Sequence, residues 1–202
     1  MDRPCGETHT AATACTLANS SPTRKTMTAA NLPPVTLILG GARSGKSGYA
    51  ERLAESGPGP CVYLATATAG DVEMAERIAL HRQRRGTRWS THEEPVALAG
   101  ALAATARPDS VVVVDCLTLW LSNVMFTGLD VENECEQLCK ALARLPGPVV
   151  LVSNEIGLGI VPDNALARRF RDAAGRMNQA VAAAADRVVF VAAGLPLVLK
   201  DN

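Results

Sequence analysis

The stretch "GGARSGKS" (residues 40–47) has the residue types and spacing of a phosphate-binding loop. It satisfies the pattern G-x-x-x-x-G-K-[ST], with glycine, lysine and serine at the required places. Glycines let such a loop turn its N–H groups toward phosphate oxygens, and the lysine supplies a positive charge for the β- and γ-phosphates. We therefore expect Lys46 to act in catalysis, and the whole loop to bind nucleotide: Gly40, Gly41, Ala42, Arg43, Ser44, Gly45, Lys46 and Ser47.

A carboxylate for a metal ion follows further along the chain. Phosphate-binding loops of this kind recruit a carboxylate for Mg²⁺ from the end of another strand, and the serine hydroxyl of the loop supplies a second ligand. Asp115 ends the apolar run "VVVVD" and fits this role. The same aspartate could instead cap the helix predicted from "LTLWL", and the two roles are compatible. We expect Mg²⁺ as a cofactor, held by Ser47 and Asp115.

His81 lies among arginines at the start of "HRQRRGTRWSTHEEP" (residues 81–95). Helical spacing places Arg77, Arg84 and Arg85 beside His81. A neutral imidazole can attack phosphorus near pH 7, and guanidinium groups can hold the phosphates and neutralise a leaving pyrophosphate. A basic, solvated helix end explains the same residues, and the pattern alone leaves both interpretations open.

Strands and helices that alternate along the chain would position these groups. Apolar β-type runs predict buried strands at 35–40, 61–66, 111–116, 148–154 and 187–194, with a short edge from "LPLVLK". Helical patterns follow the phosphate loop, cover 71–85, and recur in "EPVALAGALAATA", "LTLWLSNVMF", "ENECEQLCKALARL" and 163–185, the last with a break near Gly175. This alternation predicts an α/β fold with a mostly parallel sheet flanked by helices. Taken with the phosphate loop, we expect a P-loop NTPase of the RecA-like type.

Composition narrows the class of protein. The 202 residues fit one domain, and lysine plus arginine balances aspartate plus glutamate at 20 each. With aromatic residues at only 3%, neither a nucleic-acid partner nor a stacking platform is expected. No apolar run is long enough for a membrane span. The cysteines form no CxxC pair and fit reduced thiols in a cytoplasmic protein.

The first 33 residues differ from the rest of the chain. They are rich in Thr, Ala, Ser and Pro and have no apolar periodicity, which predicts a disordered extension over 1–33 ahead of a folded domain over 34–202 that carries the phosphate loop. Met27 lies shortly before the first expected strand, which leaves open whether translation starts at Met1 or at Met27.

Several motifs in order resemble one family. They are "GGARSGKS", "YLATA", "HRQRRGTRWSTHEEP", "VVVDCLTLWLSN" and "NEIGLGIVP" followed by "LARRFRDAAGRMNQ". Together they resemble the bifunctional adenosylcobinamide kinase and adenosylcobinamide-phosphate guanylyltransferase of cobalamin biosynthesis, over residues 35–200. In that family the motif histidine carries covalent GMP, and the matching residue is His81 rather than His92. The chain has Arg85-Gly86 where the family often has Arg-Pro, which loosens a turn but removes no reactive group.

The resemblance implies further contacts and partners. Nucleotide contacts map to Ala65, Thr66, Ala67, Arg82, Gln83, Arg84, Arg85, Glu93 and Asp115. The implied partners are adenosylcobinamide with GTP or ATP, and a homo-oligomer, a trimer. Asn154 and Glu155 could position the corrinoid hydroxyl or a metal, or could cap the glycine turn. Arg168, Arg169 and Arg171 could act at the site or be surface charges.

Two rival functions remain open at this point. One is a P-loop kinase for another small hydroxyl compound, without the guanylyl step; the histidine segment argues against it. The other is a nucleotide-binding switch without turnover, which product formation would exclude.

Overall fold

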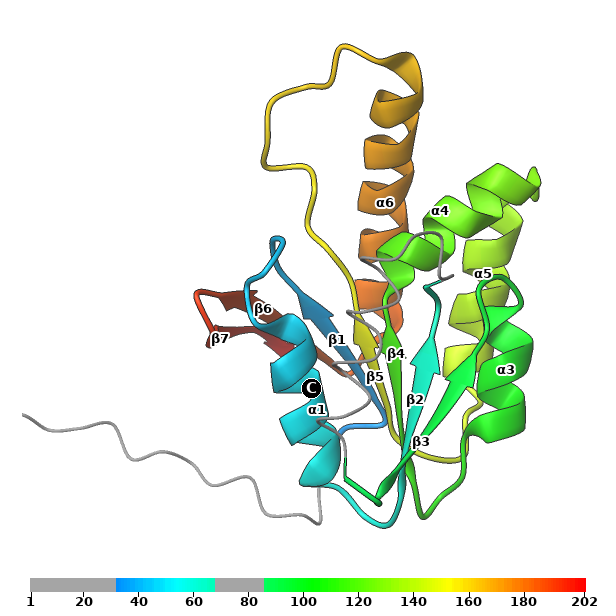
Figure 1. Cartoon of the computed structure of the whole chain (residues 1–202), viewed down its shortest axis with the longest axis vertical. Helices are drawn as coiled ribbons and strands as arrows, with labels where there is room; N and C mark the ends of the chain where they lie inside the picture. The colour runs from blue at the N-terminus through cyan, green and yellow to red at the C-terminus, as the bar shows by residue number, and fades with distance from the viewer. Residues whose placement is uncertain (1–31, 68–85) are drawn as a thin grey trace, which may run out of the picture.

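A seven-stranded sheet with the order β3-β2-β4-β5-β1-β6-β7 forms the centre of the molecule (Figure 1). The computed structural model describes residues 32–67 and 86–202. Every strand pair is parallel except β6 with β7, which is antiparallel. The strands are β1 Val35–Leu39, β2 Cys61–Ala65, β3 Trp89–Glu93, β4 Val111–Asp115, β5 Val149–Val152, β6 Arg187–Ala192 and β7 Leu195–Asp201.

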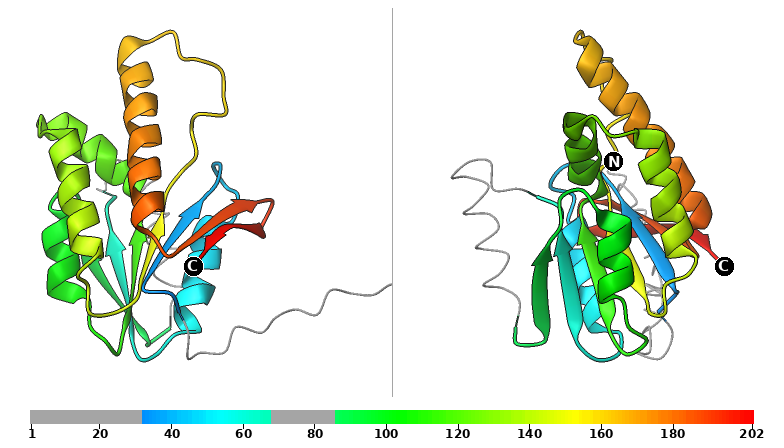
Figure 2. Two further views of the ribbon diagram at one scale, coloured as in Figure 1. Left: turned by 180° about the vertical axis from the view of Figure 1, so that it is seen from behind. Right: turned by 90° about the vertical axis from the view of Figure 1, so that its right-hand side faces the viewer.

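Helices cover both faces of this sheet (Figures 1 and 2). The helix after the phosphate loop, α1, packs through Ala50, Leu53 and Ala54 on one face, in a core with Ile38, Val113 and Val150 among others. The other helices build a larger core on the opposite face, in which Trp120 and Leu121 of α4 and Met177 of α6 are buried. The described helices are α1 Lys46–Glu55, α3 Leu98–Thr105, α4 Leu117–Thr127, α5 Val131–Leu142 and α6 Ala165–Ala184.

The inner strands read as continuous apolar runs because both of their faces are buried. In β4, Val111 to Val114 are all fully buried, and in β5 no residue is exposed by more than 1%. Burial on two sides favours Val, Ile and Leu at successive positions, without the alternation of a half-exposed strand. The α/β fold with a mostly parallel sheet expected from the sequence is thus confirmed.

Strand register brings the predicted site residues to one edge. Asp115 at the end of β4 pairs with Ala65 of β2, which pairs in turn with Glu93 of β3. Strand β5 lies between β4 and β1, so its end separates Asp115 from the phosphate loop after β1. The connection from β5 and the first turns of α6 extend past this edge (Figure 1). Ligands of open α/β sheets bind at the carboxyl ends of the strands.

Three details differ from the sequence prediction. Residues 89–93 form strand β3, which sequence analysis had left in the polar histidine segment. The short edge expected from "LPLVLK" is a seven-residue strand, β7. Helix α6 runs unbroken through Gly175, because the glycine keeps helical backbone and no neighbouring atom crowds the space where a Cβ would lie. The predicted extension and the predicted helix over 71–85 lie largely outside the described residues, and the extension stays a prediction.

Across the described ranges, none of the helices combines the length and the hydropathy that a membrane span requires.

Candidate active site

The backbone of the phosphate loop forms a cradle that contacts β6 and the turn after β6. Gly40 has φ 153°, and a Cβ placed on it would lie 2.3 Å from the Val191 carbonyl oxygen. Gly45 is left-handed (φ 97°) and begins α1 as its N-cap. The Gly194 N–H donates to the Ser44 carbonyl at 2.8 Å. Glycine is needed at both loop positions because a side chain would meet backbone or force a strained φ.

The cradle faces the N-terminal end of α1. Backbone N–H groups in the first turn of a helix have no partner within the helix, and together with the helix dipole they favour an anion. Ser47 lies partly buried in this turn, and Ala42 and Arg43 are exposed. The Ser44 hydroxyl is buried and has no hydrogen-bond partner among the described residues. The loop therefore offers a helix end and a hydroxyl to a phosphate group.

Lys46 is the buried cation of the site. Its Nζ donates to the Gly41 carbonyl at 2.6 Å, and the residue is only 7% exposed. Burial lowers the pKa of the Lys46 amino group, and the nearby Asp115 carboxylate raises it in opposition. The lysine is thus folded back onto its own loop, with a negative charge close by.

Asp115 is held by β2 rather than by the helix that follows it. The Tyr63 hydroxyl donates to Asp115 Oδ2 at 2.8 Å. The N-cap of α4 is Cys116, and no side chain caps this helix, so the alternative reading of Asp115 as an N-cap is wrong. The Thr66 hydroxyl donates to the Cys116 carbonyl and accepts from the Cys116 N–H, which anchors the end of β4.

Of the other predicted nucleotide contacts, some lie near the strand ends and the rest lie outside the described residues. Ala65, Ala67 and Glu93 lie at or next to the strand ends beside Asp115, with Glu93 exposed. Thr66 is fully buried, and its hydroxyl forms two hydrogen bonds with the Cys116 backbone, so it acts on the site through the β4 end. The remaining predicted residues, His81, Arg82, Gln83, Arg84 and Arg85, lie outside the described residues.

The segment after β5 lies against the phosphate loop. The Glu155 N–H donates to the Gly40 carbonyl at 3.0 Å. The Glu155 carboxylate accepts from the Gly157 N–H, which is the turn-capping role that the sequence left open. Arg168 donates to the carbonyls of Pro162 and Asp163, so this arginine braces the loop that leads into α6.

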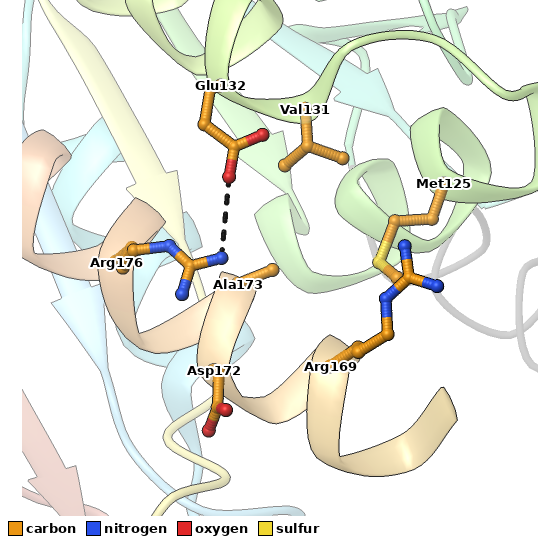
Figure 3. Close-up of a pocket in the computed structure, with 7 residues that line it drawn as sticks. All are labelled: Met125, Val131, Glu132, Arg169, Asp172, Ala173 and Arg176. Atoms are coloured by element: carbon orange, nitrogen blue, oxygen red, sulfur yellow. Dashed lines mark hydrogen bonds and ion pairs between the residues drawn. The ribbon is translucent and has the colours of Figure 1, made fainter. Parts of the chain in front are cut away.

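A separate pocket of about 210 Å³ lies between α4, α5 and α6 (Figure 3). Arg176 and Glu132 form a 3.4 Å ion pair on its wall, and Arg169 lies beside Met125. Both members of this pair are largely exposed, so the pair contributes little stability. None of the predicted nucleotide-binding residues lines the pocket, and it does not mark the phosphate site.

The four cysteines of the described ranges are free thiols. Burial raises the pKa of Cys116 to about 11, and that of Cys135 to about 11. These groups are therefore protonated near pH 7, and neither is an activated nucleophile.

Sequence analysis did not single out Tyr63, whose hydroxyl bonds Asp115, or the buried hydrogen-bonded group made of Thr118, Ser153 and Asn178. Tyr63 stands two residues before Ala65 on the same strand, so the twofold repeat of a strand turns both toward the same face. A hydroxyl-bearing residue inside the apolar run "CVYLA" was the available signal.

The fold and the cradle together define a P-loop protein of the nucleoside-triphosphate-binding class. Comparison with known proteins narrows this class. The model of the cobinamide kinase / cobinamide phosphate guanyltransferase family matches residues 36–199, and the chain belongs to this family. It is accordingly a bifunctional enzyme of adenosylcobalamin biosynthesis, with kinase and guanylyltransferase activities.

Curated relatives match almost over their full length. The bifunctional adenosylcobalamin biosynthesis protein CobP of Pseudomonas aeruginosa is 52% identical over 168 residues, which cover 82% of this chain and 97% of that protein. CobU of Salmonella typhimurium is 42% identical over 180 residues, covering 81% of this chain and 98% of the relative. A solved structure from Pyrococcus horikoshii OT3 has a TM-score of 0.51 at 8% identity, over 83% of this chain and 86% of that one, and shows a shared fold alone.

Proposed function

We propose that the chain transfers the γ-phosphoryl group of ATP or GTP to the aminopropanol hydroxyl of adenosylcobinamide, and then transfers GMP from GTP to the resulting adenosylcobinamide phosphate. The observation that carries the proposal is the cradle between β1 and α1, with buried Lys46 close to the Asp115 carboxylate. Phosphoryl transfer depends on positioning and on charge stabilisation, and these groups supply both.

In the kinase step the loop would hold the triphosphate through its amides and the α1 N-terminus. Lys46 would exchange its bond to the Gly41 carbonyl for a β- or γ-phosphate oxygen. The acceptor hydroxyl attacks the γ-phosphorus, the bond to the β,γ-bridging oxygen breaks, and the hydroxyl proton is released. The products are a nucleoside diphosphate and adenosylcobinamide phosphate.

Ser47 and Asp115 are the residues we propose to hold Mg²⁺. They offer a hydroxyl and a carboxylate, the hard oxygen donors that Mg²⁺ prefers. Within the described ranges no cluster of three or more acidic, histidine or cysteine side chains could hold a metal. That arrangement suits Mg²⁺, which commonly keeps several waters and uses one or two carboxylates plus substrate phosphates. Bound there, the ion would neutralise phosphate charge.

The guanylyl step would run through His81. Its neutral ring nitrogen attacks the α-phosphorus of GTP, an N–P bond forms, and pyrophosphate leaves. A phosphate oxygen of adenosylcobinamide phosphate then attacks the same phosphorus, the N–P bond breaks, and adenosylcobinamide-GDP is released. The covalent intermediate divides one displacement into two easier steps. Arg82, Arg84 and Arg85 would bind the phosphates on either side of the reacting bond.

The acceptor side offers apolar surface next to the cradle. After Glu155, the connection to α6 exposes Leu158 (83%) and Ile160 (97%). Because Glu155 bonds the first residue of the phosphate loop, this apolar segment begins at the phosphate site. An exposed apolar segment at such an edge suits either a bulky corrinoid or a second copy of the chain. We propose a homotrimer, and light scattering coupled to gel filtration tests it.

Labelling with α-³²P-GTP tests the covalent step. The wild-type protein should retain label after precipitation, and the label should be released by acid and stable to alkali, as a phosphoramidate is. Label should not come from γ-³²P-GTP, because the γ-phosphate leaves within pyrophosphate. His81→Ala should lose labelling but keep most of the kinase reaction, and His92→Ala is the matched control. Equal labelling of the His81→Ala protein would refute the assignment.

A further inference from the structure

A closed ring of hydrogen bonds lies buried where β5 leaves the sheet. It contains Thr118 of α4 (7% exposed), Ser153 directly after β5 (0%) and Asn178 of α6 (6%). The Asn154 N–H donates to Thr118 Oγ1 at 2.8 Å, and Asn178 Nδ2 donates to the Asn154 carbonyl at 3.2 Å. Ser153 Oγ donates to Asn178 Oδ1 at 2.7 Å and lies 3.3 Å from Thr118 Oγ1.

The chemistry of each group decides which atoms donate and which accept in this ring. A backbone N–H can only donate, so Thr118 Oγ1 accepts from Asn154, and its own hydrogen faces two acceptors, Ser153 Oγ and the Cys116 sulfur. The Ser153 hydrogen is used on Asn178, whose amide group returns to the Asn154 carbonyl. Each of the three side chains therefore both donates and accepts, and both polar backbone groups of Asn154 are bound.

Polar side chains this deeply buried are costly unless they are satisfied, so a complete ring that binds both backbone groups of one residue calls for an explanation. This residue lies at the end of the strand between β1 and β4, which carry the phosphate loop and Asp115. Its neighbours on both sides are tied to β1 and the loop: the Ser153 N–H donates to the Ile38 carbonyl at 2.9 Å, and the Glu155 N–H donates to the Gly40 carbonyl at 3.0 Å.

We propose that Thr118, Ser153 and Asn178 are positioning residues for phosphoryl transfer. Their ring fixes the Asn154–Glu155 segment against the first residue of the phosphate loop, and so sets the acceptor side of the site relative to the bound triphosphate. The assignment rests on the proposed kinase function. Nucleotide affinity is supplied mainly by the loop amides and Lys46, which lie outside the ring. Loss of the ring therefore lowers turnover rather than nucleotide binding.

The test compares two substitutions at Thr118. Thr118→Val keeps the shape but removes the hydroxyl, which leaves the Asn154 N–H and Ser153 without this partner. Thr118→Ser removes a methyl group but keeps the hydroxyl. Thr105 bonds only carbonyls of its own helix α3, so Thr105→Val is the matched control. We expect Thr118→Val to lower kcat of the kinase step about 10- to 100-fold, with the GTP dissociation constant changed less than about threefold. Thr118→Ser should recover most of the kcat.

Amide hydrogen exchange provides a readout independent of catalysis. Peptides spanning residues 150–164 should exchange faster in Thr118→Val than in wild type, while peptides of α1 should not change. If Thr118→Val does not fold, Ser153→Ala replaces it, since it removes the hydroxyl that joins Asn178 to Thr118 and adds no charge. Unchanged kcat with only a lower melting temperature would overturn the proposal, as would unchanged exchange over 150–164. Absence of kinase activity in the wild-type protein would instead contradict the proposed function, and the exchange result would still judge the ring.

Discussion

Substituting Gly40 with alanine tests whether the phosphate loop is built on contact with β6. A Cβ at this position would lie 2.3 Å from the Val191 carbonyl oxygen and 2.8 Å from the Ser44 hydroxyl. The first distance is 1.1 Å (3.4 − 2.3) below the 3.4 Å at which ordinary contact begins. The obstacle is a backbone atom of a central strand, which cannot rotate away as a side chain can. The backbone also has φ 153°, which side chains rarely adopt.

The expected loss of stability follows from these two effects. A strained backbone conformation costs about 1–3 kcal/mol, and a core overlap costs about 1–3 kcal/mol. Alanine recovers about 0.4–1 kcal/mol by restricting the unfolded chain. The net destabilisation of Gly40→Ala is therefore about 3 kcal/mol, and the melting temperature should fall by about 6–12 °C. Gly41→Ala is the matched control, because no atom lies within 4 Å of the added Cβ, and its stability should stay within about 1 kcal/mol of wild type.

Urea unfolding followed by tryptophan fluorescence measures the difference. Trp120 is 1% exposed in the larger core and reports loss of packing. If Gly40→Ala and Gly41→Ala unfold at the same urea concentration, the contact between the loop and β6 does not constrain the cradle, and the reasoning fails. If they differ as expected, titration of Gly40→Ala with GTP should also show weaker binding, because the shifted residue opens the loop.

Further substitutions address the charges and the chain before the domain. Lys46→Met should abolish both activities, yet melt at the same or a higher temperature. Burial lowers the Lys46 pKa in the folded state, so keeping this lysine charged costs stability at every pH below that folded-state pKa. A large fall in melting temperature would contradict this. Asp115→Asn keeps an acceptor for Tyr63 and should fold normally, while Mg²⁺-dependent turnover falls about 100-fold or more; normal turnover at ordinary Mg²⁺ concentrations would assign the metal to another carboxylate. Deleting residues 1–26 should leave activity and melting temperature nearly unchanged, and a melting temperature lower by several degrees would show that the segment docks on the domain.

Sequence periodicity predicted the buried strands well because both of their faces are apolar. The run from Val111 to Val114 could only be a strand covered on two sides, and the structure confirms it. Strand β3 escaped detection because it lies at the sheet edge, where Ser90, His92 and Glu93 are exposed and carry no apolar pattern. Its strand conformation comes from pairing with β2, which is a tertiary interaction.

The positions of the phosphate loop and of Asp115 could be predicted, because a sequence motif requires particular backbone conformations there. The phosphate loop and Asp115 fall at the expected strand ends, because the loop needs its glycines and the sheet needs its register. The supporting residues were not predictable. Asn178 sits among Ala174, Met177 and Val181 on a buried helix face, and its partners lie 24 and 25 residues away in the sequence. No local sequence pattern indicates that such a residue forms hydrogen bonds with the backbone and side chains at the end of β5.

The attachment of the phosphate loop to β6 also affects how the protein is made. Strand β1 and its loop are synthesised early, but β1 pairs with β5 and β6, with Val35 opposite Val149 and Thr36 opposite Arg187. The Ser44 carbonyl accepts from the Gly194 N–H, which belongs to the turn after β6. Contacts between segments so far apart slow folding, and a chain still being translated lacks them. The nucleotide therefore cannot stabilise a partly synthesised domain, and an arrested chain that ends before β6 has no cradle through which a ligand could rescue it from degradation.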